Sequence, residues 1–173
     1  WSGNRWAAQA GTHVAGNFVS FPTDLRIEWT AARPWAYTHR IPLYGTYTHN
    51  GRSLGFKHGP NSQLLLIKNR WWINPRSRIS IVFDQLKWGV KPEDETEPGF
   101  DFGNNPNESY AIANPEYHNS TSWLIGDIQT TQKIKFLWEY QLSNILELEL
   151  GASHKWGISE YRNSYSIQMN IDY

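Results

Sequence analysis

The chain has 173 residues with no cysteine, and its 16 basic and 16 acidic residues give a formal net charge of zero. This length suffices for one domain with a sizeable core, the lack of cysteine excludes disulfides and thiolate metal sites, and the balanced charge gives no indication of nucleic-acid binding. Aromatic residues make up 15% of the chain, a share that suits membrane interfaces and sugar-binding surfaces alike.

Alternation of apolar and polar residues with period 2 dominates the chain, and helical periodicity is nearly absent. Segments bounded by Pro, Gly, Asn and Asp predict seven strands. In chain order they cover residues 12–20, 24–32, 61–71, 78–88, 122–141, 145–155 and 163–173. No apolar run approaches the length of about 18 residues that a membrane-spanning helix needs.

Segment 122–141 is predicted to be one long strand rather than a hairpin. One register runs through it without a break, with Leu124, Ile128, Ile134, Phe136, Trp138 and Tyr140 on one parity and Asp127, Lys133, Lys135 and Glu139 on the other. Thr130-Thr131 followed by Gln is also poor turn chemistry. The C-terminal segment 163–173 shows the same strict alternation. Alternation alone leaves two interpretations open, because the apolar face of such a sheet looks either to a soluble core or to lipid.

The lengths of the connections favour the interpretation in which the apolar face contacts lipid. Short connections (21–23, 72–77 and 142–144) alternate with long ones (33–60, 89–121 and 156–162). Short turns at one end and long loops at the other are typical of outer-membrane β-barrels, and a soluble sandwich does not need this pattern. Charges also keep to one parity in segments 24–32 and 145–155, as a polar lumen requires, although 61–71 and 78–88 carry apolar residues on both parities.

The predicted fold is therefore all-β: a single antiparallel transmembrane β-barrel domain over 1–173, located in the outer membrane of a Gram-negative bacterium. Seven strands is an odd number and bacterial barrels usually have even numbers, so we expect about 7–8 strands here as the C-terminal part of a larger barrel. The start at Trp1, without an initiator Met, agrees with a mature product or a fragment. The last strand then runs toward the periplasm, and Tyr173 is the expected signal for the barrel assembly machinery.

Loop 33–60 is the candidate ligand surface, because it combines aromatic rings with four basic residues and contains no acid. Aromatic rings stack on sugars and arginines clamp carboxylates, so the pattern suits an acidic polysaccharide. The other interpretation is a packed loop that plugs the lumen. For either role the candidate residues are Trp35, Tyr37, His39, Arg40, Tyr47, His49, Arg52, Lys57 and His58.

Signals for catalysis or a cofactor are weak. Loop 89–121 is acidic and offers oxygen ligands for Ca²⁺, but it lacks D-x-D-x-D spacing, so a solvated acidic loop is favoured over a Ca²⁺ site. Pairing with the basic loop 33–60 is a further interpretation. The chain contains no G-x-S-x-G, H-E-x-x-H or phosphate-loop motif. Ser153 and His154 are adjacent on a strand and point to opposite faces. We therefore predict no catalytic residue, no metal site and no cofactor.

Several motifs resemble the Wzi-type capsule-assembly outer-membrane proteins and their relatives in Bacteroidetes-like bacteria. They are DLRIEWT (24–30), RPWAYTHR (33–40), YTHNGRSLGFKHGPNSQ (47–63) and YQLSNILELELG (140–151). The resemblance covers most of the chain from about residue 12, and the N-terminal portion of the family pattern is missing. It implies a barrel of roughly 18 strands in the complete protein, in line with the large even-numbered barrels of this class. It also implies a non-catalytic role in assembling or anchoring capsular polysaccharide.

The leading functional hypothesis is thus a non-enzymatic outer-membrane barrel that binds or helps to assemble polysaccharide at the cell surface. Its expected partners are the lipid bilayer, an anionic polysaccharide and the assembly machinery, with no nucleic acid. Two alternatives stay open: an outer-membrane porin or transport channel, and a soluble β-sandwich carbohydrate-binding module.

Overall fold

A computed structural model describes residues 5–18, 21–38, 48–49, 52–93, 102–105, 107, 122–143, 146–158 and 161–171. The chain divides into two compact units. The loop unit comprises residues 1–10, 29–64 and 86–130, and the strand unit comprises residues 11–28, 65–85 and 131–173.

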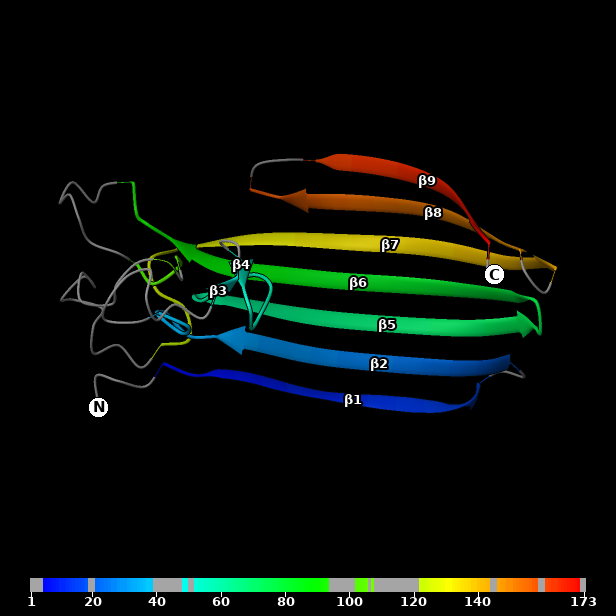
Figure 1. Ribbon diagram of the computed structural model, residues 1–173, viewed down its shortest axis with the longest axis horizontal. Coiled ribbons are helices and arrows are strands. Elements are labelled where there is room, and N and C mark those ends of the chain that lie inside the picture. Colours follow the sequence, from blue (N-terminus) through cyan, green and yellow to red (C-terminus); the bar gives the residue numbers. More distant parts are fainter. Residues whose placement is uncertain are drawn as a thin grey trace. The chain divides into compact units, whose positions relative to one another are not determined.

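Seven strands follow one another in sequence order across one antiparallel sheet (Figure 1). They are β1 (Ala7–Phe18), β2 (Phe21–Ala32), β5 (Ser62–Asn74), β6 (Ser77–Val90), β7 (Asp127–Ser143), β8 (Leu146–Gly157) and β9 (Arg162–Ile171). A separate small hairpin pairs β3 (Thr48–His49) with β4 (Arg52–Ser53). The large sheet is open, with β1 and β9 at its edges. The prediction of an all-β antiparallel fold is confirmed.

Among the residues that the structure describes, no helix is long and apolar enough to cross a membrane.

The predicted strand 122–141 is one unbroken strand, as expected, but it begins at Asp127. Residues 122–126 are not part of it for two reasons. Gly126 has a φ of +77°, which strand geometry does not allow. The backbone N–H and C=O of Ile125 bond instead to the buried side chain of Asn61. A contact between residues 64 positions apart thus overrides the local alternation.

All four hairpin connections are shorter than predicted. Phe21–Thr23 belong to β2 and Leu142–Ser143 belong to β7, so the expected connections 21–23 and 142–144 are wrong. The other two connections differ more. The β5–β6 turn is reduced to Pro75 and Arg76, because Pro suits the second position of a turn and Asn74 Oδ1 accepts a hydrogen bond from Arg76 N–H at 2.9 Å. The connection after β8 covers only 158–161, so the expected long loop 156–162 is wrong. Apolar and polar positions continue to alternate through Trp156, and this extends β8.

The buried core of the described residues lies in the loop unit. Its fully or nearly buried apolar residues are Ala31, Ala32, Trp35, Ala36, Phe102 and Ile125. Asn61 is completely buried among them and has a φ of +53°. Its backbone N–H donates to Arg33 O and its carbonyl accepts from Gly89 N–H. A side chain at Gly89 would overlap the Ile125 carbonyl, so close packing requires glycine there.

Candidate functional site

The strand unit separates charge from apolar surface by strand parity. Every Asp, Glu, Lys and Arg within its strands lies on a single parity of its strand: Asp24, Arg26, Glu28, Lys68, Arg70, Arg78, Asp84, Lys133, Lys135, Glu139, Glu147, Glu149, Lys155 and Arg162. Alternate residues of a strand point to opposite sides, so each strand presents its charges to one side. This set is called the charged face.

Contacts between neighbouring strands show that the charged face is continuous. On one half, Asp24 lies 3.9 Å from His13 on β1 and 4.0 Å from Arg70 on β5. Arg70 Nε also donates to Ser80 Oγ on β6 at 3.4 Å. On the other half, Lys135 of β7 lies 3.9 Å from Glu149 of β8. Lys155 of β8 stands opposite Arg162 of β9 in the strand register.

The opposite parity of the same strands is largely apolar and is called the apolar face. It carries Val14, Phe21, Leu25, Ile27, Leu65, Ile67, Trp71, Ile73, Ile79, Ile81, Phe83, Ile134, Phe136, Trp138, Tyr140, Leu146, Leu148, Leu150, Ala152, Trp156, Tyr165, Ile167, Met169 and Ile171. Register places Leu150 between Trp138 and Ile167. Many of these side chains are exposed, and Ile167 reaches 79%. A contiguous exposed apolar surface of this kind marks an interaction with lipid or protein.

Several polar side chains on the apolar face are satisfied within the sheet. Thr23 Oγ1 donates to Phe21 O at 3.1 Å, and Asn69 Nδ2 donates to Asp24 O at 2.8 Å. His154 Nδ1 lies 2.6 Å from Asn163 Oδ1. Trp138 Nε1 likewise donates to Ser77 Oγ at 2.9 Å. Water would satisfy these groups on an exposed soluble surface, whereas an apolar solvent requires such internal partners.

An aromatic cluster lies in the loop unit, where β1 and β2 approach their loop ends. Trp123 makes edge-to-face contacts with Trp6 at 4.4 Å and with Trp29 at 5.0 Å between ring centroids. On β2, Trp29 has the parity of Leu25 and Ile27, which is that of the apolar face. Tryptophans at strand ends on this parity suit a membrane interface.

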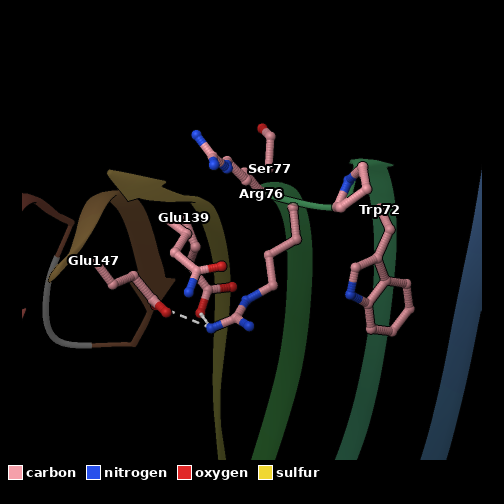
Figure 2. Close-up of a pocket in the computed structure, with 8 residues that line it drawn as sticks. Trp72, Arg76, Ser77, Glu139 and Glu147 are labelled. Atoms are coloured by element: carbon pink, nitrogen blue, oxygen red, sulfur yellow. Dashed lines mark hydrogen bonds and ion pairs between the residues drawn. The ribbon is translucent and has the colours of Figure 1, made fainter. Parts of the chain in front are cut away.

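Near the β5–β6 turn, one arginine joins three strands. Arg78 Nη2 of β6 donates to Glu139 of β7 at 2.8 Å and to Glu147 of β8 at 2.9 Å. Figure 2 shows both glutamates reaching toward the same point from neighbouring strands. The small pocket beside them holds about 50 Å³ and is bordered by Trp72. Because the guanidinium occupies the space between the carboxylates, the arrangement serves strand pairing rather than cation binding.

We expect Arg78→Met to lower the free energy of unfolding by about 1–2 kcal/mol, because two half-buried carboxylates lose their shared cation and repel each other. A urea titration of the folded fraction in detergent measures the loss. Adding Glu147→Gln to Arg78→Met should recover part of it, since one repelling charge is removed. Lys155→Met, elsewhere on the charged face, is the control. If Arg78→Met alone is as stable as the wild type, Arg78 does not stabilise the pairing of these strands.

Part of the predicted ligand loop forms a pocket against two strands, called here the Tyr37 pocket. It holds about 360 Å³ and is lined by the start of β1 with Gln9, by Thr30 of β2, and by Tyr37, Gly55, Phe56 and Lys57. Phe56 N–H donates to Tyr37 Oη at 3.2 Å. Thr30 has the parity of the charged residues of β2, so segment 55–57 lies on the side opposite Trp29.

The predicted ligand residues are only partly brought together. Tyr37 and Lys57 share the pocket, and exposed His58 follows with its ring 5.3 Å from Phe56. His49 is exposed and stands opposite Arg52 in the small hairpin. Trp35 is only 6% exposed and packs in the core. Four predicted residues lie outside the described residues: His39, Arg40, Tyr47 and Tyr173.

The sequence did not predict that Gln9 and Thr30 line the pocket. It also did not predict that buried Asn61 bonds to several loop segments. An Asn that follows Gly-Pro is a signal for a left-handed turn, which Asn61 adopts. Nothing in the pattern indicated which residues Asn61 binds. Among the described residues, no three His, Asp or Glu side chains gather as metal ligands do.

No family model, curated protein or solved structure matches this chain. The resemblance to the Wzi-type proteins therefore stays a prediction.

Proposed function

We propose that this chain forms part of a non-enzymatic antiparallel β-barrel in the bacterial outer membrane, whose loops hold anionic polysaccharide at the cell surface. The observation that carries the membrane part is the two-sided sheet of the strand unit. Its charges keep to one face, and its other face is apolar, exposed and internally hydrogen-bonded at Thr23, Asn69 and His154. Lipid on that face explains why the charges keep to the other side, why the apolar side chains are exposed, and why the polar groups among them have internal partners.

Strand direction supports membership of a larger barrel. Seven antiparallel strands alternate in direction, so the two edge strands, β1 and β9, run the same way. These two strands cannot close on each other with antiparallel pairing. Neither edge has the usual protection, because β1 contains no Pro, Lys, Arg, Asp or Glu, and the only such residue of β9 is Arg162 at its first position. Further strands of opposite direction therefore complete the barrel.

The polysaccharide part is supported by the chemistry of loop 33–60. Its described portion exposes Lys57 and His58 near the rings of Tyr37 and Phe56, and His49 is exposed in the small hairpin. Cations and aromatic faces without a competing carboxylate suit an acidic sugar polymer. A polymer gains from many such weak contacts, since linked sites add to avidity.

We expect the double variant Arg52→Ala and Lys57→Ala to retain several-fold less anionic polysaccharide on cells that display the protein, because two cations are lost from the loop. Labelled polysaccharide bound per cell measures this, with surface protein quantified in parallel. Arg76→Ala, in the turn at the other end of the strands, is the matched control and should change nothing. Equal retention by the double variant at equal surface level overturns the polysaccharide part.

A channel is the second candidate, because the charged face would line a water-filled lumen. Single-channel conductance in a planar bilayer separates the two functions. The third hypothesis, a soluble sandwich module, requires a covering layer over Ile167 and its neighbours, yet Ile167 is 79% exposed.

A further inference from the structure

The Tyr37 pocket has the size and the mixed lining of a site for one sugar ring. Its volume of about 360 Å³ falls within the range of roughly 300–1,000 Å³ that is common for small-molecule sites. Tyr37 and Phe56 supply aromatic surface, and Gln9 and Thr30 supply an amide and a hydroxyl from the strands. Rings pack against the C–H face of a sugar, while amides and hydroxyls bond its hydroxyl groups.

The aromatic wall is held in place by the backbone around it. Tyr37 has a φ of +70°, an uncommon conformation for a residue with a side chain, and its hydroxyl accepts the Phe56 N–H bond. Gly55 lies directly on the tyrosine ring: a Cβ at this position would be 2.6 Å from Cε1 and Cζ. The ring can occupy this position only because residue 55 is glycine. Strained, closely packed backbone of this kind is common at ligand sites.

Charge decides the class of sugar. Among the residues that the structure describes, Lys57 is the one charged residue that lines the pocket, and no carboxylate lines it. Glu28, two residues before Thr30 on the same parity of β2, is already paired with Arg26 at 2.6 Å. An ammonium group at the edge of a pocket with an aromatic wall favours a carboxylate on the sugar over a neutral ring.

We propose that the Tyr37 pocket binds one carboxylate-bearing hexose unit, a uronic acid residue, of the surface polysaccharide. The aromatic wall formed by Tyr37 and Phe56 takes the ring, Gln9 and Thr30 bond its hydroxyl groups, and Lys57 pairs with its carboxylate. The inference rests on the proposed function and adds the position of the site and the charge of its ligand.

The test is calorimetric titration of the purified protein in detergent with two probes of equal length, a glucuronic-acid oligosaccharide and a neutral glucose oligosaccharide. The wild type should bind the acidic probe about tenfold more tightly, the effect of one charge-assisted hydrogen bond. Lys57→Gln should remove this difference while the neutral probe binds as before. Gly55→Ala should weaken both probes, because the new methyl group displaces the Tyr37 ring. Arg76→Ala, in the β5–β6 turn and outside the pocket, should change neither.

Two results would overturn the inference: no preference for the acidic probe in the wild type, or a preference that persists in Lys57→Gln. The proposed function is judged separately by polysaccharide retention on cells. Retention without a Lys57-dependent preference rejects the pocket alone, whereas a protein that retains no polysaccharide rejects the function itself. Lys57 is exposed, so Lys57→Gln should fold normally and keep the titration interpretable if Gly55→Ala does not fold.

Discussion

Replacing Ile167 by Arg should cost about 2–4 kcal/mol of membrane insertion, the penalty for a cation facing lipid near the middle of a transmembrane strand. Ile167 lies in the middle of β9 on the apolar face, opposite Leu150. It is 79% exposed in the strand unit. On a soluble protein, such an exposed substitution would change stability by no more than about 0.5 kcal/mol. The folded, inserted fraction in lipid vesicles over a urea titration measures the cost.

Gln168→Arg is the matched control for this experiment. Gln168 is the next residue of the same strand, is also exposed, and stands opposite Glu149 on the charged face. The two variants add the same charge to adjacent positions on opposite sides of the strand, so a difference between them in lipid vesicles reports which side faces the bilayer. If both variants insert equally well, the apolar face does not contact lipid and the barrel proposal is wrong.

Replacing Asn61 by Ala should destabilise the loop unit by about 3–5 kcal/mol, because three buried hydrogen bonds disappear together. Asn61 Nδ2 donates to Phe102 O at 3.0 Å and to Ile125 O at 3.1 Å, and its Oδ1 accepts from Ile125 N–H at 3.0 Å. All three backbone groups would lose this partner in a region that excludes water. The rate of hydrogen exchange at the Ile125 amide measures this effect. It should rise by the factor that corresponds to the lost free energy of stabilisation.

Asn61→Gly separates the loss of the side-chain hydrogen bonds from the backbone strain that alanine adds at position 61. Glycine accepts the φ of +53° without strain but makes none of the side-chain bonds. We expect the Gly variant to lose slightly less stability than the Ala variant, the difference of about 1 kcal/mol being the backbone cost. Asn105→Ala is the control in the same unit, since the Asn105 side chain accepts one bond from Asn107 N–H in a turn. Normal exchange in Asn61→Gly would show that the three bonds do not hold the loops.

The strands and their two faces could be predicted because they are local properties. Period 2 places Ile167 and Gln168 on opposite sides whatever else the chain does, and the seven predicted strands all form. The alternation also predicted that β7 is one unbroken strand. What failed were the boundaries: residues 122–126 were predicted as the start of this strand, but Asn61 binds Ile125 and Gly126 has a φ of +77°.

Some residues of the candidate site could likewise be predicted from the sequence, and others could not. Tyr37 and Lys57 could be selected from composition, because an acid-free run of cations and aromatics is visible in the sequence. Gln9 and Thr30 could not, because their place in the pocket depends on how the loop lies on β1 and β2. Trp35 has the same composition signal as Tyr37, yet it is 6% exposed and fills the core. Composition does not distinguish a ring that is offered to a ligand from one that packs.

By itself, the sequence determined the all-β class, the places of the seven strands along the chain and the separation of charge from apolar surface. These follow from side chains alternating along an extended backbone, which needs no partner. The tertiary structure alone decided that Arg78 joins Glu139 and Glu147, that Asn61 holds Ile125, and that Gly55 lies against the Tyr37 ring. Each of these joins residues distant in the chain, and their proximity depends on register and loop path, which a repeating pattern does not specify.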